Sequence, residues 1–390
     1  MKERDKFLLI AAVFLAAFYI PLQTPRVQTA ILEAFFMLQD YAQKHVLTCL
    51  VPAFFIAGAI GVFVSQTSVL KYFGAGANKV LSYGVASVSG SVLAVCSCTV
   101  LPLFAGIYTR GAGIGPATAF LYSGPAINVL AIILTARVLG FEMGLARAVG
   151  AVVFSIIIGL LMHLIFMKEE KEKAAAALLL PPPPEDNRTL GQYGLYFLTM
   201  VLILIFAAWG KPAQPVGFFN AVYNIHWYLT IFFLALLAVI LKLWFNKDEM
   251  AAWVESSWGF AKQILPLLLG GVLVAGFLMG RPDADTGIIP AKYISVLVGG
   301  NSLSANFIAS VVGAFMYFAT LTEIPILQGL IGSGMGKGPA LALLLAGPAL
   351  SLPSMIVVRQ VMGTKKAAVY ISLVVIMSTV TGVIYGTFWG

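Results

Sequence analysis

Apolar stretches long enough to cross a bilayer recur along the whole chain, with short polar connections between them. A transmembrane helix needs about 20 such residues. Amphipathic approaches at 29–45 and 248–262 precede two of these stretches. The pattern predicts an all-α polytopic membrane protein with about 8–10 membrane segments. Its unbroken spans are expected at 7–22, 46–64, 146–167, 193–209, 227–245, 262–280 and 367–389.

Four further apolar segments, 81–108, 117–139, 303–330 and 339–362, are interrupted by polar residues, glycine or proline. Unpaired backbone groups at membrane depth are tolerated only where protein buries them or where they line a polar cavity. In transporters, breaks at matching places in two repeats mark a solute site. The alternative is a set of proline kinks that serve close helix packing.

The broken segments belong to an internal repeat. Adding 223 to each position from 87 to 140 lays that stretch on 310–363 without a gap, and 19 of the 54 pairs are identical. Every glycine and every proline of the first stretch falls on the same residue in the second. Glycine and proline dictate the backbone path, so a backbone geometry was duplicated.

The chain divides into five parts around this repeat. Residues 1–45 hold the first span and an amphipathic approach, 46–167 the first repeat, and 246–390 the second repeat. Residues 168–192 form a charged, Pro-rich cytoplasmic linker, and 193–245 hold two connecting spans. If the Cys-containing segment and its partner are re-entrant, the repeats are inverted; if every segment crosses, they are parallel. The re-entrant topology places 16 of the 24 Lys and Arg residues in the cytoplasm, which favours inverted repeats.

Composition narrows the class further. Hydrophobic residues make up 60% of the chain and charged residues 10%, which excludes a soluble enzyme. The net charge of +8 comes from basic residues in short connections, so it indicates membrane orientation rather than nucleic-acid binding. Expected partners are membrane lipid, a small-molecule or metalloid solute, and a second copy in a homo-oligomer. No cofactor is expected, and no metal cluster or structural zinc site, because His45, His163 and His226 are scattered and none lies near Cys96 and Cys98 in the sequence.

The candidate solute-binding residues lie at the four breaks. In the first pair of breaks they are Cys96, Ser97, Cys98 and Thr99, with Thr320 and Thr322 in the second half. In the second pair they are Ser123, Gly124, Pro125 and Asn128, with Gly347, Pro348 and Ser351 in the second half. Cys96 and Cys98 would point apart on an intact helix but can converge on unwound backbone, where paired thiolates suit a soft metal or trivalent metalloid. The alternative is that both cysteines are small apolar packing residues.

Glu323 is the acidic residue inside these broken segments, between Thr322 and Ile324. A carboxylate at membrane depth is costly unless it is paired, hydrated or protonated, so it indicates function. Glu323 is therefore the candidate for proton coupling. The alternative is a structural role as the partner of Lys337 or of a free N–H group near Pro325.

Several motifs resemble a known family. Cys-Ser-Cys followed by proline, Arg-Gly-Ala-Gly-Ile-Gly-Pro-Ala (110–117) and Phe-Leu-Tyr-Ser-Gly-Pro-Ala-Ile-Asn (120–128) are similar to the YraQ/ArsP-type predicted permeases. The resemblance implies a bacterial inner-membrane permease, and some relatives export trivalent organoarsenicals through membrane cysteines. Carried over, the role of arsenic ligand falls on Cys96 and Cys98. The second half departs from this pattern, with Ala319 and Leu321 at the cysteine positions.

The sequence therefore predicts a secondary permease, not an enzyme, that exports a small thiophilic solute with proton coupling through Glu323. A passive channel would use the same cavity. A membrane thiol redox protein using Cys96 and Cys98 is a further alternative, although no cofactor motif accompanies them.

Overall fold

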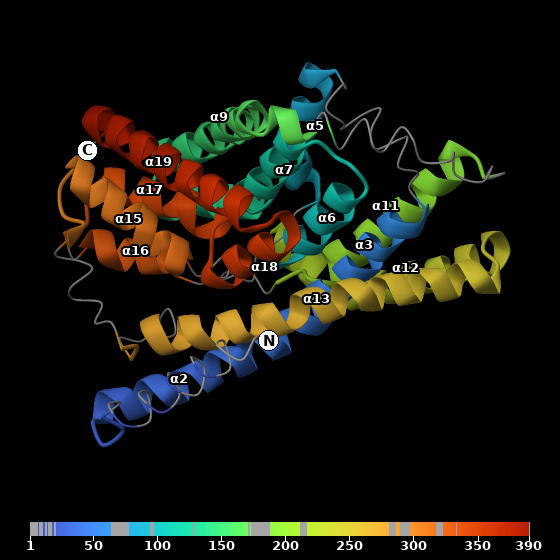
Figure 1. Cartoon of the computed structure of the whole chain (residues 1–390), viewed down its shortest axis with the longest axis horizontal. Helices are drawn as coiled ribbons and strands as arrows, with labels where there is room; N and C mark the ends of the chain where they lie inside the picture. The colour runs from blue at the N-terminus through green and yellow to red at the C-terminus, as the bar shows by residue number, and fades with distance from the viewer. Residues whose placement is uncertain are drawn as a thin grey trace.

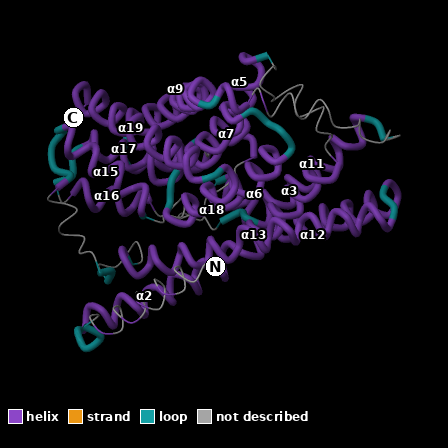
Figure 2. Tube along the Cα trace, viewed as in Figure 1, coloured by secondary structure: helices purple, strands orange, loops and turns teal. Residues whose placement is uncertain are grey.

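The structure is a computed structural model, and it describes most of the chain outside the linker. The described residues are 7, 11, 14, 18, 21–63, 78–93, 97–127, 129–170, 172, 188–210, 217–280, 286–288, 297–316, 323–332 and 334–389. Within them the regular structure is helical, apart from an isolated bridge between Gly299 and Met335 (Figure 2). The predicted all-α class is confirmed.

One group of helices forms an elongated arm of the molecule (Figure 1). Its long helix α13 packs along α2 and α3, and α11 packs on α12. The predicted approach at 248–262 and the span at 262–280 form one continuous helix, α13, rather than two elements. Asn246 and Glu249 start it with a capping box, in which each side chain accepts the other's backbone N–H. The arm contains α2 (Pro25–Tyr41), the π-helix η1 (Ala42–Leu50), α3 (Val51–Phe63), α11 (Leu190–Ala207), α12 (Phe218–Trp244) and α13 (Lys247–Met279).

The remaining helices form a compact body beside the arm (Figure 1). Its first set is α5 (Lys79–Leu93), α6 (Ser97–Thr109), α7 (Ile114–Ala126), α8 (Val129–Val138) and α9 (Phe141–Ile165). Its second set is α15 (Leu303–Phe315), α16 (Glu323–Gly332), α17 (Lys337–Ala349), α18 (Leu352–Met362) and α19 (Thr364–Trp389). The centre of each set is almost wholly buried: α7 packs on α5 and α9, and α17 packs on α15 and α19.

Two of the predicted breaks are confirmed. The axis bends by 47° between α7 and α8, and by 49° between α17 and α18. Pro125 and Pro348 lie in the last turns before these bends, where the missing N–H group and the proline ring weaken the helix. Pro102 behaves differently, because α6 runs from Ser97 to Thr109 with this proline inside it.

Four helices in the described part of the chain are long and apolar enough to cross a membrane, or up to seven spans if each bent pair counts as one. The four are α9, α12, α13 and α19. Three shorter apolar helices lie at Thr99–Thr109, Gly191–Ala207 and Leu303–Phe315. A multi-pass membrane protein is confirmed, and the finer number of 8–10 segments stays a prediction. The expected first span at 7–22 lies largely outside the described residues.

Corresponding helices of the two sets begin in the same register. The helices α17 and α19 start at the positions onto which the sequence repeat maps the starts of α7 and α9. Each set also contains a close glycine crossing at an equivalent position. A Cβ atom on Gly159 of α9 would lie 2.7 Å from the Gly115 carbonyl oxygen, and one on Gly382 of α19 would lie 2.7 Å from the Gly338 carbonyl oxygen. These four glycines let the backbones of neighbouring helices touch.

These crossings predict a stability effect. Replacing Gly159 or Gly382 with alanine forces a methyl group against backbone oxygen, and overpacking of this kind costs about 1–3 kcal/mol. We expect both variants to have a lower midpoint of thermal unfolding in detergent. Gly259→Ala is the matched control, because a Cβ atom there has no neighbour within 4 Å. An unchanged midpoint in both crossing variants would show that the helices can separate without loss.

Candidate functional site: a buried ion pair at the broken helices

The candidate site is built around an ion pair inside the helical body. Arg147 lies on α9 and Glu323 is the first residue of α16. The Arg147 Nη2 and Glu323 Oε1 atoms are 2.6 Å apart, and both side chains are 0% exposed. Two buried charges are tolerated together because each compensates the other, whereas either alone would be strongly unfavourable. The pair therefore fixes α9 against α16.

Arg147 also binds the broken helix of the first set. Its Nε atom donates to the Ala126 carbonyl oxygen at 3.4 Å, and Nη1 donates to Thr135 Oγ1 at 3.0 Å. Ala126 is the last residue of α7, so its carbonyl stands at the break where the helical hydrogen bonds stop. One guanidinium thus satisfies a carbonyl of the α7–α8 break and a carboxylate at the start of α16.

The buried hydroxyl group of Tyr122 lies close to this pair, and two more buried hydroxyl groups lie near Tyr122. Tyr122 of α7 lies within the electrostatic influence of Arg147 and faces Ser378 of α19, and Tyr370 of α19 lies near Tyr122. All three side chains are fully buried. Within the described part of the chain, none of the three hydroxyls has a hydrogen-bond partner of good geometry. A buried polar group without such a partner costs stability.

The break between α17 and α18 has a different chemistry. Ser351 stands at the start of α18 and accepts the Ser354 N–H group at 3.3 Å, while the two hydroxyls lie 2.7 Å apart. Ser351 therefore acts as a helix cap in this conformation. In the first set, Ser123 donates to the Ala86 carbonyl oxygen of α5 at 2.8 Å. Gly347 packs closely against Gly313 of α15.

The other predicted site residues are described to different extents. Cys96, Asn128, Thr320 and Thr322 lie outside the described residues. Ser97 and Cys98 begin α6, and only their backbone is described; Thr99 follows them and is buried. Gly124, Pro125 and Pro348 lie inside buried helical turns. Convergence of the two thiols stays a prediction. The described residues contain no group of three or more His, Cys, Asp or Glu side chains that could hold a metal ion.

Sequence reasoning selected Glu323 but missed its partner. Lys337, the alternative considered from the sequence, instead donates to the Trp389 carbonyl oxygen at 2.8 Å. Arg147 was missed because it lies in an apolar span that contains no proline, and the glycines at 144 and 150 do not interrupt its helix. One signal was available, since a lone intramembrane acid calls for an intramembrane cation. Arg147 lies in the second turn of the membrane helix α9.

Fold and site together define a class: a polytopic helical membrane protein whose broken helices meet at a buried ion pair, as in membrane permeases. The comparisons identify the family. The chain matches ArsP_1, described as a predicted permease, over residues 31–387, and it belongs to this family. Membership implies a transporter rather than an enzyme.

Two relatives extend this result. The UPF0718 protein MJ0584 of the archaeon Methanocaldococcus jannaschii is 48% identical over 349 residues, which cover 89% of this chain and 93% of that protein. The UPF0718 protein YraQ of Escherichia coli K12 is 25% identical over 294 residues, which cover 75% of this chain and 63% of YraQ. No solved structure matches the chain significantly. One of these relatives is archaeal and the other bacterial, so the family is not confined to bacterial inner membranes.

The ion pair predicts a non-additive mutational pattern. Arg147→Met or Glu323→Met alone leaves one unpaired buried charge, which costs about 3–5 kcal/mol in such pairs. The double variant removes both charges, so we expect it to be more stable than either single variant. Thermal unfolding midpoints of the four proteins in detergent test this cycle. Strictly additive losses would mean that the two side chains do not interact.

Proposed function

We propose that this protein is a secondary permease in which protonation of Glu323 drives movement of the two halves against each other. The observation that carries the proposal is the Arg147–Glu323 pair, with its 2.6 Å contact and complete burial. Protonating the carboxyl removes the charge that Arg147 neutralises. The guanidinium is then an unpaired buried charge, which is strongly unfavourable, so it is driven toward water and away from the Ala126 carbonyl, which loosens the α7–α8 break.

The surroundings of Glu323 favour this role. Helix α16 packs against α8 and α17. The charged residues of these two helices are Arg137, in the last turn of α8, and Lys337, whose ammonium donates to Trp389. Arg147 of α9 is the charged group that acts on Glu323 directly. A change in the charge of Glu323 therefore acts directly on Arg147, which in turn contacts the broken helix.

Alternating access further requires two comparable halves. We propose that the two sets of helices are inverted repeats that move as units. The common register of their helix starts and their equivalent glycine crossings support a repeat, and the larger number of Lys and Arg residues that the re-entrant topology places in the cytoplasm favours inversion. The breaks between α7 and α8 and between α17 and α18 would then flank the solute path. The membrane proposed for the protein is the plasma membrane.

The proposed solute is small and thiophilic, such as a trivalent metalloid or organoarsenical, and the proposed direction is export. Cys96 and Cys98 support this choice, because two thiolates close in sequence, at a break predicted from the sequence, suit a soft centre. Cys98 lies in the first turn of α6, which packs against α3, α7 and α18. Helix α6 thus lies beside α18 of the second half.

Proton coupling has a direct test in proteoliposomes. Glu323→Gln carries a permanently neutral side chain, so we expect solute flux to lose its response to an imposed pH gradient. Glu142→Gln is the matched control, because Glu142 is an exposed acid on the same helix as Arg147. Flux that follows the gradient equally in the parent and in Glu323→Gln would contradict the proposal. Electrical currents far above transporter turnover would instead indicate a channel.

The solute class has a separate test. Cys96→Ser and Cys98→Ser should each lower the export of a trivalent monoalkyl arsenical by about tenfold or more, since loss of a metal-site partner has effects of this size. Cys49→Ser serves as the control for loss of a thiol elsewhere. Arsenic retained in loaded vesicles provides the measurement. Unchanged export in the Cys96→Ser/Cys98→Ser double variant would exclude the thiols as ligands.

A further inference from the structure

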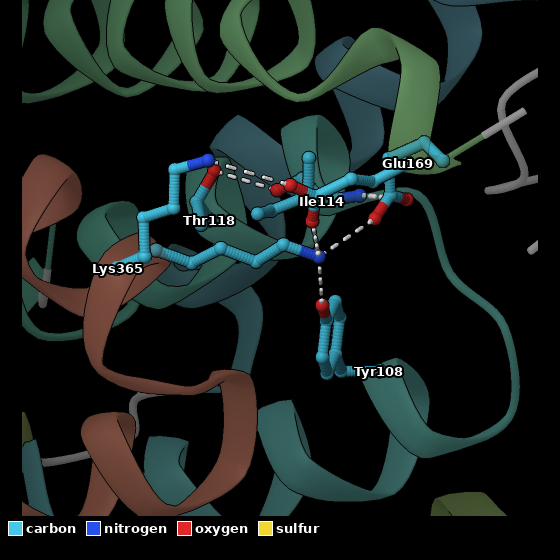
Figure 3. Close-up of polar contacts among 7 residues, drawn as sticks. Tyr108, Ile114, Thr118, Glu169 and Lys365 are labelled. Carbon is cyan, nitrogen blue, oxygen red and sulfur yellow. Dashed lines mark hydrogen bonds and ion pairs between the residues drawn. The ribbon is translucent and has the colours of Figure 1, made fainter.

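A second cluster of charges joins the two sets of helices at one end of the body (Figure 3). Its centre is Lys366, in the first turn of α19, whose side chain is 8% exposed. The Lys366 Nζ atom lies 3.1 Å from Glu169 Oε2 and 3.6 Å from Glu170 Oε1, and it donates to Tyr108 Oη at 3.3 Å. The two acids follow the end of α9, and Tyr108 lies in the last turn of α6. One ammonium of the second set therefore holds two segments of the first.

The cluster also reaches the central helix of the first set. Glu170 Oε2 accepts the N–H group of Ile114, the first residue of α7, at 2.9 Å. The carboxylate thereby satisfies an otherwise free helix N–H group and lies at the positive end of the helix dipole. The start of α7 is thus tied, through Glu170 and Lys366, to α19.

The equivalent end of the second set is held differently. Lys337 is the first residue of α17, and the sequence repeat places it on Ile114, the first residue of α7. Its ammonium donates to the Trp389 carbonyl oxygen at 2.8 Å in an exposed contact, and both residues belong to the second set. The start of α7 is therefore tied by buried charges across the two sets, and the start of α17 by an exposed contact within one set.

We propose that Tyr108, Glu169, Glu170 and Lys366 form a gate, closed in this structure, that seals the solute path on the linker side of the membrane. The start of α17 is then the gate of the opposite side. This inference rests on the proposed function, since a gate requires two halves that move. The four residues hold the linker side closed, so the structure represents the conformation that is closed on that side.

Charged groups suit a gate that must open and close repeatedly. When the gate is closed, the Coulomb attraction offsets the loss of hydration of Lys366 and Glu170. When it opens, water hydrates the separated charges and replaces that attraction. The two states therefore differ little in free energy, and a modest bias from solute or proton binding can move the equilibrium.

Hydrogen exchange measured by mass spectrometry on the purified full-length protein tests the gate. In Lys366→Met and in Glu170→Gln, we expect amide exchange in the first turns of α7 to accelerate by about tenfold and exchange in the first turns of α17 to slow. The two changes in exchange rate have opposite signs because opening at the start of α7 closes the start of α17 in the same two-state equilibrium. Lys366→Arg keeps the charge and should restore the parent pattern.

The neighbouring lysine provides the matched control. Lys365 has a side chain that is 81% exposed and lies 3.8 Å from Glu169, so Lys365→Met should leave exchange at both ends unchanged. Acceleration at both ends, at α7 alone, or at neither end would overturn the gate, because each would mean that the cluster only stabilises local structure. If Lys366→Met fails to fold, Glu170→Gln carries the test.

The experiment also separates this inference from the proposed function. Exchange is measured without any solute, so it reports the gate whether or not transport is observed. If amide exchange changes in opposite directions at the starts of α7 and α17 but no proton-driven flux is seen, the gate is supported and the proton coupling is refuted. If proton-driven flux is seen but amide exchange does not change in opposite directions at the two helix starts, the proton coupling is supported and the gate is refuted.

Discussion

The contact between Arg147 and Glu323 is the interaction on which the interior of this protein depends. Neither charge is stable alone where both side chains are 0% exposed, so α9 and α16 must remain close for as long as both groups are ionised. The same guanidinium satisfies the Ala126 carbonyl at the end of α7. A broken helix, which would otherwise leave a free carbonyl at membrane depth, is thereby made compatible with the membrane.

This arrangement combines rigidity with the ability to change. The glycine crossings at Gly159 and Gly382 hold the helices of each set in direct backbone contact, which favours movement of each set as a unit. The contacts between the sets rest partly on charges, at Arg147 and at Lys366. Charge contacts respond to protonation and hydration, whereas close-packed contacts do not. The proposed proton coupling therefore acts at the boundary between the sets.

Much of the fold could be predicted from the sequence, because lipid and glycine impose strong constraints. The all-α class, the bends after Pro125 and Pro348, and the common register of α7 and α17 follow from apolar length and from glycine and proline placement. Local patterns were less informative about helix continuity. A charged amphipathic stretch and an apolar span form the single helix α13, since helical hydrogen bonding continues unless a residue breaks it.

The candidate site was only half predictable. Glu323 was marked by its own cost in the membrane, but Arg147 lies far earlier in the chain, in an unbroken span. Pairing across such a separation is set by the packing of the assembled helices, which no local pattern encodes. The cluster around Lys366 has the same character, because Tyr108, Glu170 and Lys366 look like ordinary residues at helix ends until the helices are assembled.

Infrared difference spectroscopy of the reconstituted protein during a change in pH tests the central claim most directly. The account predicts that acidification produces the C=O band of a protonated, buried carboxylic acid, that the band reverses on return to neutral pH, and that it is absent from Glu323→Gln. A carboxyl band of the same size in Glu323→Gln, or no such band before the protein unfolds, would contradict the claim that Glu323 exchanges its partner Arg147 for a proton.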